Sequence, residues 1–289
     1  MTMRSALRAL RDQPFVRERL VTFFGFLKRA GIPIGSTIYR HIPYVGVVTV
    51  DLPSGGSFRM HSQGGAVENG LYWEGLSAHE PASMRNWIRN AAHAGCVLDI
   101  GANAGIFALA AAAAGAAAVH AFEPLPRVHA LLAANVRLNA FQGLRAWPLA
   151  VGSSAGMATL YDPSVDASAP TSASLSAEFT KRHFGDMPGT PVEVVTIDEF
   201  CERGQLPRIC LVKLDVEGYE DHALRGMQAT LRRDKPIVLM EVLPEYEAKL
   251  RATVFEVLGE DYEWIPIHEG SSEPDRNVWL RPKVSNADS

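Results

Sequence analysis

Short apolar runs alternate with amphipathic segments through most of the chain after residue 96. Consecutive apolar residues are typical of strands buried on both faces of a parallel sheet, whereas apolar positions three and four residues apart indicate helices. The runs predict strands at 97–100, 118–122, 145–151, 209–214 and 236–242, and the amphipathic segments predict helices at 104–114, 126–138 and 244–258. This alternation predicts an α/β fold with a mostly parallel, doubly wound sheet.

The end of the chain departs from this alternation. Apolar runs at 262–267 and 277–280 are separated by only nine residues, and these residues are mostly polar. A helical crossover between parallel strands needs a dozen residues or more. The last strand is therefore expected to lie antiparallel beside the strand before it.

The part of the chain before this domain has a different pattern. Residues 1–40 have an apolar helical face with basic residues between, and 45–50 and 57–60 flank Leu52-Pro-Ser-Gly-Gly56, which is good hairpin chemistry. A helix at 81–94 leads into the sheet. We therefore divide the chain into a helical and hairpin extension, 1–69, and a main domain, 70–289. An insertion at about 153–197 is expected to hold strands at 158–161 and 192–197 and a Ser/Ala-rich loop at 164–177, a candidate binding element.

Charge is distributed unevenly along the chain. The net charge is −4, but residues 1–40 carry +6 and the remainder carries −10. A nucleic-acid substrate would favour a basic surface on the catalytic body, so we expect no nucleic-acid partner. The basic N-terminal helix is able to lie on a membrane surface, but we favour packing on the domain or on a second subunit of a homodimer.

The cysteines point to a reducing compartment. Cys96, Cys201 and Cys210 have no paired spacing, which favours free thiols over a disulfide or zinc site. No secretory signal is recognised, and the Ala-rich stretch near residue 110 is too short to span a bilayer. We therefore expect a cytoplasmic protein.

The segment Asp99-Ile-Gly-Ala-Asn-Ala-Gly105 ends the first main strand and opens a helix. Gly101 and Gly105 allow a ligand to approach the backbone, so a nucleoside-like cofactor fits here. Only one of the three glycines of a dinucleotide fingerprint is present, and Asp99 would repel a pyrophosphate. Asp99, Gly101, Asn103 and Gly105 are therefore candidate cofactor residues for a ligand with positive charge, and a dinucleotide dehydrogenase is the alternative.

Further acids follow the later strands. Glu123 ends the strand at 118–122 and is placed to accept hydrogen bonds from ribose hydroxyls. Asp215 and Glu217 follow the strand at 209–214, where ligands of an open α/β sheet bind, so they are candidate active-site residues. His183 and His222 are rival proton acceptors.

Glu241 ends the next strand and reaches the same edge of the sheet. Together with Asp215 and Glu217 it offers oxygen ligands that suit magnesium or calcium. Acids at this spacing are weak support for a metal, so we predict none.

Five motifs in order resemble the FkbM family of methyltransferases. They are Val97-Leu-Asp-Ile-Gly-Ala-Asn-Ala-Gly105, Ala121-Phe-Glu-Pro124, Asn135-Val-Arg-Leu-Asn139, Val195-Thr-Ile-Asp198 and Val212-Lys-Leu-Asp-Val-Glu-Gly-Tyr-Glu220. Upstream, Tyr72-Trp-Glu-Gly75 and Glu80-Pro81 are similar to a segment that precedes the first motif in that family. The resemblance covers roughly residues 70–245, and the Ala-rich first helix and the loop at 164–177 depart from it.

The resemblance implies a class I methyltransferase Rossmann-like sheet, to which an antiparallel last strand also belongs. It implies S-adenosylmethionine as methyl donor and O-methylation of a hydroxyl on a sugar, glycan or natural-product acceptor. It places Asp99, Gly101, Asn103, Gly105 and Glu123 at the cofactor and Asp215 with Glu217 in the active site. The rival hypotheses are an NAD-type dehydrogenase and a cofactor-binding partner protein without catalysis.

Overall fold

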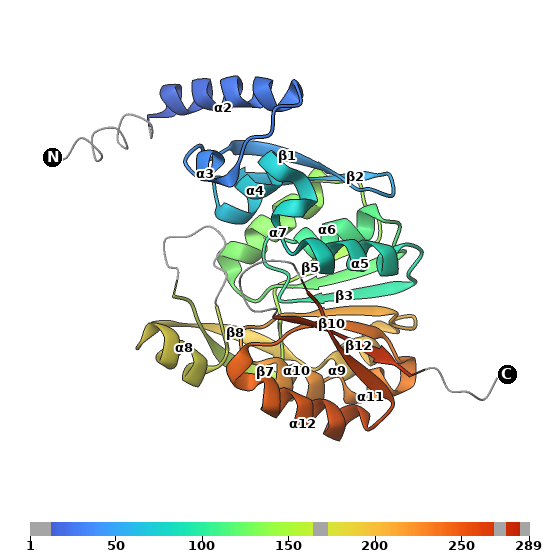
Figure 1. The fold of residues 1–289 in the computed structure, drawn as a ribbon. Helices are drawn as coiled ribbons and strands as arrows, with labels where there is room; N and C mark the ends of the chain where they lie inside the picture. The colour runs from blue at the N-terminus through green and yellow to red at the C-terminus, as the bar shows by residue number, and fades with distance from the viewer. Residues whose placement is uncertain (1–12, 164–172, 269–275, 284–289) are drawn as a thin grey trace.

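The computed structural model describes residues 13–163, 173–268 and 276–283. A seven-stranded sheet forms its centre, in the order β11-β12-β10-β9-β3-β4-β5. Its strands are β3 (Cys96–Ile100), β4 (Ala118–Phe122), β5 (Leu144–Trp147), β9 (Leu211–Leu214), β10 (Ile237–Glu241), β11 (Tyr262–Pro266) and β12 (Asn277–Pro282). Helices cover both faces of this sheet (Figure 1).

One face is covered by the helices that precede and follow the first strands, and the other by the later helices (Figure 1). The first group is α5 (Pro81–Ala91), α6 (Ile106–Ala113) and α7 (Pro126–Leu138). The second group is α9 (Ile197–Gly204), α10 (Glu220–Arg225), α11 (Gln228–Asp234) and α12 (Glu247–Leu258), preceded by the short turn η2 (Pro244–Tyr246). The chain is therefore an α/β fold of three layers, as predicted.

The last strand confirms the antiparallel prediction. β12 runs antiparallel to both β11 and β10, and it lies between them, with Val238 opposite Leu280. The pairs β10 with β9, β9 with β3, β3 with β4 and β4 with β5 are all parallel. This is the sheet of class I methyltransferases, so the predicted fold class is confirmed.

The strand predicted at 145–151 is wrong as a single element. The chain leaves the main sheet after Trp147 and forms β6 (Ala150–Val151), which belongs to a separate three-stranded sheet of order β6-β8-β7. Pro148 lies at the break, where its fixed φ and missing N–H do not continue a ladder.

The insertion contains more structure than its sequence indicates. It forms β7 (Gly156–Tyr161), α8 (Ala177–Phe184) and β8 (Gly189–Val195). The strand predicted at 192–197 ends earlier because Thr196 caps α9, its hydroxyl oxygen accepting a hydrogen bond from Glu199 N at 3.2 Å. Most of the predicted loop at 164–177 lies outside the described residues.

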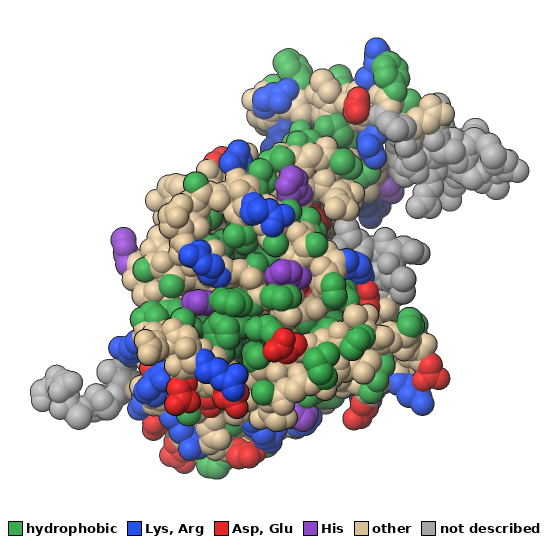
Figure 2. Space-filling model, turned by 180° about the vertical axis from the view of Figure 1, so that it is seen from behind, with side chains coloured by type: hydrophobic (Ala, Val, Ile, Leu, Met, Phe, Trp, Pro, Cys, Tyr) green, Lys and Arg blue, Asp and Glu red, His purple; other side chains and the backbone are tan. Residues whose placement is uncertain are grey.

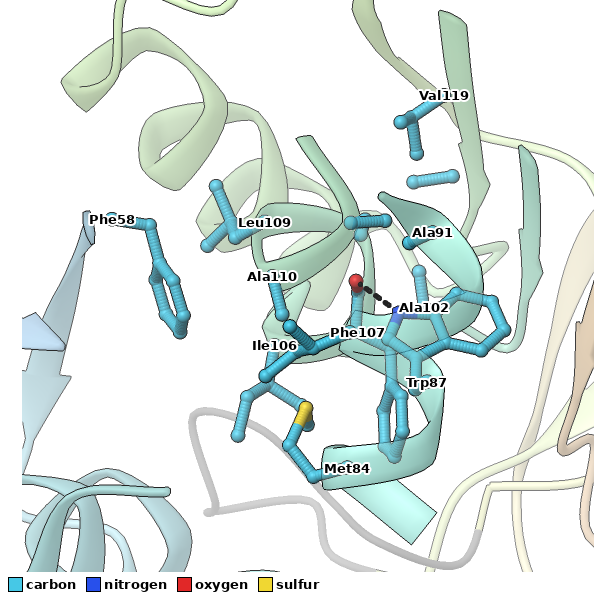
Figure 3. Packing of buried hydrophobic residues seen from close by; sticks show 14 of the residues in the cluster. Phe58, Met84, Trp87, Ala91, Ala102, Ile106, Phe107, Leu109, Ala110 and Val119 are labelled. Atoms are coloured by element: carbon cyan, nitrogen blue, oxygen red, sulfur yellow. Dashed lines mark hydrogen bonds between the residues drawn. The ribbon is translucent and has the colours of Figure 1, made fainter. Parts of the chain in front are cut away.

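The described chain before α5 forms α2 (Pro14–Arg29), α3 (Ser36–Tyr39), β1 (Val45–Asp51), β2 (Ser57–Gln63), α4 (Ala66–Glu74) and the short turn η1 (Gly75–Ala78). β1 and β2 pair as the predicted hairpin. Phe58 of β2 is fully buried in the same core cluster as Trp87 and Phe107 (Figure 3). Trp87 Nε1 donates to the carbonyl of Phe107 at 2.9 Å, which satisfies the one polar atom of this buried ring.

Two asparagines dock the hairpin onto the main domain. Asn135 lies in the last turn of α7, and Asn139 is the residue that follows the end of this helix. Asn139 Oδ1 accepts from Arg59 N at 2.8 Å, and its Nδ2 donates to Arg59 O at 2.7 Å. Asn135 Oδ1 accepts from His61 N at 2.7 Å, and its Nδ2 donates to Ala104 O at 2.8 Å. Asn139 thus pairs with both backbone groups of Arg59 on β2, and Asn135 links His61 of β2 to the loop before α6.

The Asn135→Ala variant should lower the free energy of unfolding by about 1–3 kcal/mol, because two buried backbone groups lose their partners. Urea denaturation followed by circular dichroism measures this loss. Asn90→Ala, which removes only a bond to a carbonyl within its own helix, is the control and should change stability little. Equal stability of the two variants would contradict the docking role of Asn135.

Candidate active site

A cavity of about 790 Å³ opens at the carboxyl ends of the central strands. This volume is within the range of small-molecule and cofactor sites. Its walls include the predicted residues Asp99, Gly101, Asn103, Glu123, Asp215 and Glu217. The tertiary structure therefore brings together residues from the ends of β3, β4 and β9, as expected for an open α/β sheet.

Gly105 is the exception, and it does not line the cavity. It is the N-cap of α6 with φ 94°, and a Cβ there would lie 2.5 Å from Leu132 Cδ1. Gly101 lines the cavity but also meets a packing constraint, since a Cβ would lie 1.7 Å from the carbonyl oxygen of Asp215. Both glycines are thus required by contacts within the protein, whatever ligand the loop holds.

Glu123 shapes the loop that follows β3. Its Oε2 accepts from Asn103 N at 3.0 Å and its Oε1 accepts from Leu125 N at 2.9 Å. Asn103 has φ 49°, a left-handed conformation that asparagine tolerates better than most residues. Burial raises the pKa of Glu123 to about 7, although these two backbone N–H groups oppose the shift. Each carboxylate oxygen retains a second lone pair for a ligand.

Asp99 is a buried acid with unused bonding capacity. Its side chain is 1% exposed, and its Oδ2 has no hydrogen-bond partner in the described part of the chain. Burial raises its pKa to about 7, against the opposing charge of Lys213. An orphaned buried oxygen on a cavity wall suits a ligand that brings a hydrogen-bond donor or a positive charge.

Lys213 and Asp215 form a buried ion pair at 2.8 Å. Lys213 is 1% exposed, and its ammonium also lies 5.0 Å from the centre of the Phe107 ring. Burial alone would raise the pKa of Asp215, but the charge of Lys213 and hydrogen bonds from Glu241 and Lys213 lower it below its usual value. Asp215 is therefore the ionised acid of this wall.

Glu217 and Glu241 behave differently from Asp215. Ligand oxygens of these three acids lie within 4.8 Å of one another. Burial, with the charges of Asp215 and Glu220, raises the pKa of Glu217 to about 9. Burial and the neighbouring acids also raise the pKa of Glu241 well above its usual value. At neutral pH, Glu217 and Glu241 thus keep their protons, and Asp215 is the ionised carboxylate beside Lys213.

This arrangement offers oxygen ligands to a cation, but Lys213 already supplies one permanent positive charge. The absence of a metal therefore stays a prediction.

The backbone at Glu217 is held by its surroundings. Glu217 has φ 53°, a rare conformation for a residue that is not glycine. Its carbonyl accepts from the hydroxyl of Ser174 at 2.6 Å, while Glu220 Oε1 accepts from the N–H groups of Val216 and Gly218 at 3.1 and 3.2 Å. The last glutamate of the motif is thus a support for the loop, and the end of the Ser/Ala-rich segment reaches the active site.

The sequence did not identify several residues of the cavity wall, and the two histidines proposed as rival proton acceptors lie elsewhere. His79 and Glu80 line the cavity, and Glu80 accepts a hydrogen bond from Asn277 at 2.8 Å. The segment around Glu80-Pro81 carried a signal, because it was part of the family resemblance. The rival histidines do not line the cavity: His183 contacts Glu245 at 2.9 Å, and His222 stacks on Tyr219.

The sheet and the acid-lined cavity define a class of protein that binds a nucleoside-type cofactor. A model of the FkbM methyltransferase domain matches residues 99–263, more than half of the chain. The chain therefore belongs to the FkbM family of S-adenosylmethionine-dependent methyltransferases. This membership speaks against the dehydrogenase alternative. No curated protein sequence matches the chain.

Solved structures of methyltransferases match the chain at low sequence identity. An FkbM methyltransferase from Methylobacillus flagellatus is 15% identical, with a TM-score of 0.47, covering 65% of this chain and 44% of that one. A SAM-dependent methyltransferase from Agrobacterium tumefaciens is 12% identical, with a TM-score of 0.42, covering 83% of this chain and 71% of that one. The chain thus spans less than half of the Methylobacillus protein.

The Glu217→Gln variant should be more stable than the wild type at alkaline pH. Folded Glu217 holds its proton up to about pH 9, whereas a glutamate in the unfolded chain loses it near 4.5, so wild-type stability falls as pH rises between these values. Glutamine removes this loss. We expect a gain in Tm of about 2–4 °C or more at pH 8 that shrinks towards pH 5.

Thermal unfolding across pH 5–9 measures this difference. Glu202→Gln, at an exposed position on α9, provides the baseline. A gain that is constant with pH would show that the proton of Glu217 is not its cause.

Proposed function

We propose that this protein is an O-methyltransferase that transfers the methyl group of S-adenosylmethionine to a hydroxyl of a sugar, glycan or natural-product acceptor. The observation that carries this proposal is one cavity with two kinds of acidic wall. Asp99, whose Oδ2 has no partner among the described residues, and Glu123 lie at the ends of β3 and β4, and the carboxyl cluster of Asp215 and Glu217 follows β9.

The residues at the first wall fit the cofactor. Its sulfonium and amino groups are positive, which suits the unpaired Oδ2 of Asp99. The free lone pairs of Glu123 suit the ribose hydroxyls. Gly101 and Asn103 present their backbone to the cavity between these acids, where the methionine end would lie. The bound cofactor supplies an electrophilic methyl group.

The residues at the second wall suit a hydroxyl acceptor. The reaction needs the acceptor oxygen in line with the methyl–sulfur bond, and it needs a group that takes the hydroxyl proton. Asp215 is ionised and is fixed by Lys213, so we assign it to accept that proton. Glu217 carries a proton at neutral pH and is placed to donate a hydrogen bond to a neighbouring acceptor oxygen.

The charge of the cavity limits the acceptors. Its described wall contains one lysine, Lys213, and one arginine, Arg276. The same wall contains seven acids: Glu68, Glu80, Asp99, Glu123, Asp215, Glu217 and Glu241. Because Glu217 and Glu241 keep their protons while Asp215 is ionised, the wall offers both donors and acceptors to the hydroxyl groups of an acceptor. Neutral polyhydroxy compounds fit best, which agrees with the absence of a nucleic-acid partner in our proposal.

The setting of the enzyme is also a proposal. The free thiols of Cys96 and Cys201 are buried, which supports a reducing, cytoplasmic location. No helix in the described ranges is long and apolar enough to cross a membrane.

The Glu123→Ala variant should bind S-adenosylhomocysteine more weakly by about 1.5–3 kcal/mol, the worth of hydrogen bonds to a charged acceptor. Isothermal titration calorimetry on the purified chain measures the affinity. Glu193→Ala, at an exposed position on β8, is the matched control and should bind normally. Unchanged affinity in Glu123→Ala would remove this residue from the cofactor site.

The Asp215→Asn variant should lose turnover by about a hundredfold or more, the usual contribution of a general base, while its affinity for S-adenosylhomocysteine stays within a few-fold of the wild type. Turnover is measured with methyl-labelled donor and a panel of sugars and polyol natural products, and mass spectrometry locates the methyl group. Near-normal turnover of Asp215→Asn together with inactive Glu217→Gln would exchange the two roles. Donor binding without transfer to any acceptor would favour the non-catalytic alternative.

A further inference from the structure

Helix α2 is anchored to the rest of the chain along one face. Leu20, Phe24 and Leu27 pack against the small cluster that contains Trp73. Gly25 is buried where a Cβ would lie 3.1 Å from the hydroxyl oxygen of Tyr72. The position of the helix is therefore fixed by packing on α4.

The opposite face of α2 has a different character. Phe15, Phe23 and Phe26 are 63%, 57% and 63% exposed. With Arg19, whose guanidinium lies 4.3 Å from the centre of the Phe15 ring, they recur at spacings of three and four residues and form one stripe. We call these four residues the outer α2 face. It lies at one end of the molecule, at the top of both views, where hydrophobic and basic side chains gather (Figures 1 and 2).

Most charged residues in the segment that carries this surface are basic. Between residues 13 and 40 the chain has Glu18 as its single acid, against Arg17, Arg19, Lys28, Arg29 and Arg40. Three exposed phenylalanines among arginines exceed what single scattered apolar side chains explain. Aromatic rings and cationic groups on one helix face are the combination that binds the headgroup region of an anionic bilayer.

We propose that the outer α2 face binds the surface of an anionic lipid membrane. The phenylalanines insert among the lipid chains next to the headgroups, and Arg19 with the neighbouring Arg17 and Arg29 binds lipid phosphates. The inner face stays on α4, so binding needs no unfolding of the helix. This inference is independent of the proposed methyl transfer, because no cavity residue takes part.

A second copy of the chain is the competing occupant. A symmetric contact through this face would place Arg19 and its basic neighbours opposite the same residues of the other copy. Like charges brought together in this way repel one another, whereas anionic lipid attracts them. Charge complementarity therefore favours the membrane.

The test is sedimentation of the full chain with vesicles of phosphatidylcholine containing 40% phosphatidylglycerol, a composition chosen at roughly the anionic level at which basic helices respond. The variant Phe15→Ser/Phe23→Ser/Phe26→Ser should lose at least tenfold in partition coefficient. Phe255→Ser, on α12 at the other end of the molecule and 62% exposed, is the matched control and should bind as the wild type does. Thermal unfolding verifies that all three proteins are folded.

Two further readouts distinguish the sources of binding. Binding to pure phosphatidylcholine vesicles should be several-fold weaker because these vesicles carry no net negative charge. Binding to the anionic vesicles in 0.5 M salt should also be several-fold weaker, because salt screens the attraction between exposed charges. The proposal is overturned by no binding to anionic vesicles, or by equal binding of the triple serine variant. A dimer in analytical ultracentrifugation that the triple variant abolishes, without vesicle binding, would assign the face to a second copy and overturn it as well.

Discussion

The buried ammonium of Lys213 is the constraint on which the active-site wall depends. A charge at 1% exposure is stable only with close partners, because burial removes its hydration. Asp215 provides a direct ionised partner, and the carboxyl groups of Glu80 and Glu241 lie nearby. Lys213 therefore ties together the ends of β9 and β10 and the segment before α5. These elements are far apart in sequence, and they meet here because the carboxyl ends of parallel strands share one edge.

Lys213 and Arg276 do not balance the acids around them, and this imbalance, together with burial, decides which acids keep their protons. Asp215, nearest to the ammonium, stays ionised, whereas Glu217 and Glu241 keep their protons. Neighbouring acids with pKa values pushed apart are the usual arrangement for proton transfer in enzymes. At the cofactor end, burial raises the pKa values of Asp99 and Glu123 to about 7. A positively charged ligand bound there favours the ionised forms of both acids.

Three of the six non-glycine residues with positive φ in the described chain line the same cavity. Glu80, Asn103 and Glu217 all have left-handed φ values without being glycine, and all three line its wall. Such conformations persist only where the surroundings enforce them. At Asn103 the enforcing contact is Glu123, and at Glu217 it is the pair of supports from Ser174 and Glu220. The insertion that carries Ser174 thus supports the active site at Glu217. This insertion contains the loop at 164–177, which departs from the family resemblance.

The sequence by itself determined the fold class and the antiparallel last strand. Of the seven site residues that it predicted, six line the cavity. These follow from local signals: apolar periodicity, a connection too short for a crossover, and acids placed just after strands. Only the tertiary structure decided that Gly105 lies outside the cavity wall and that the chain leaves the main sheet after Trp147. It also placed His79 and Glu80 in the wall and left His183 and His222 outside it. Those outcomes depend on contacts between distant segments, which periodicity and spacing do not encode.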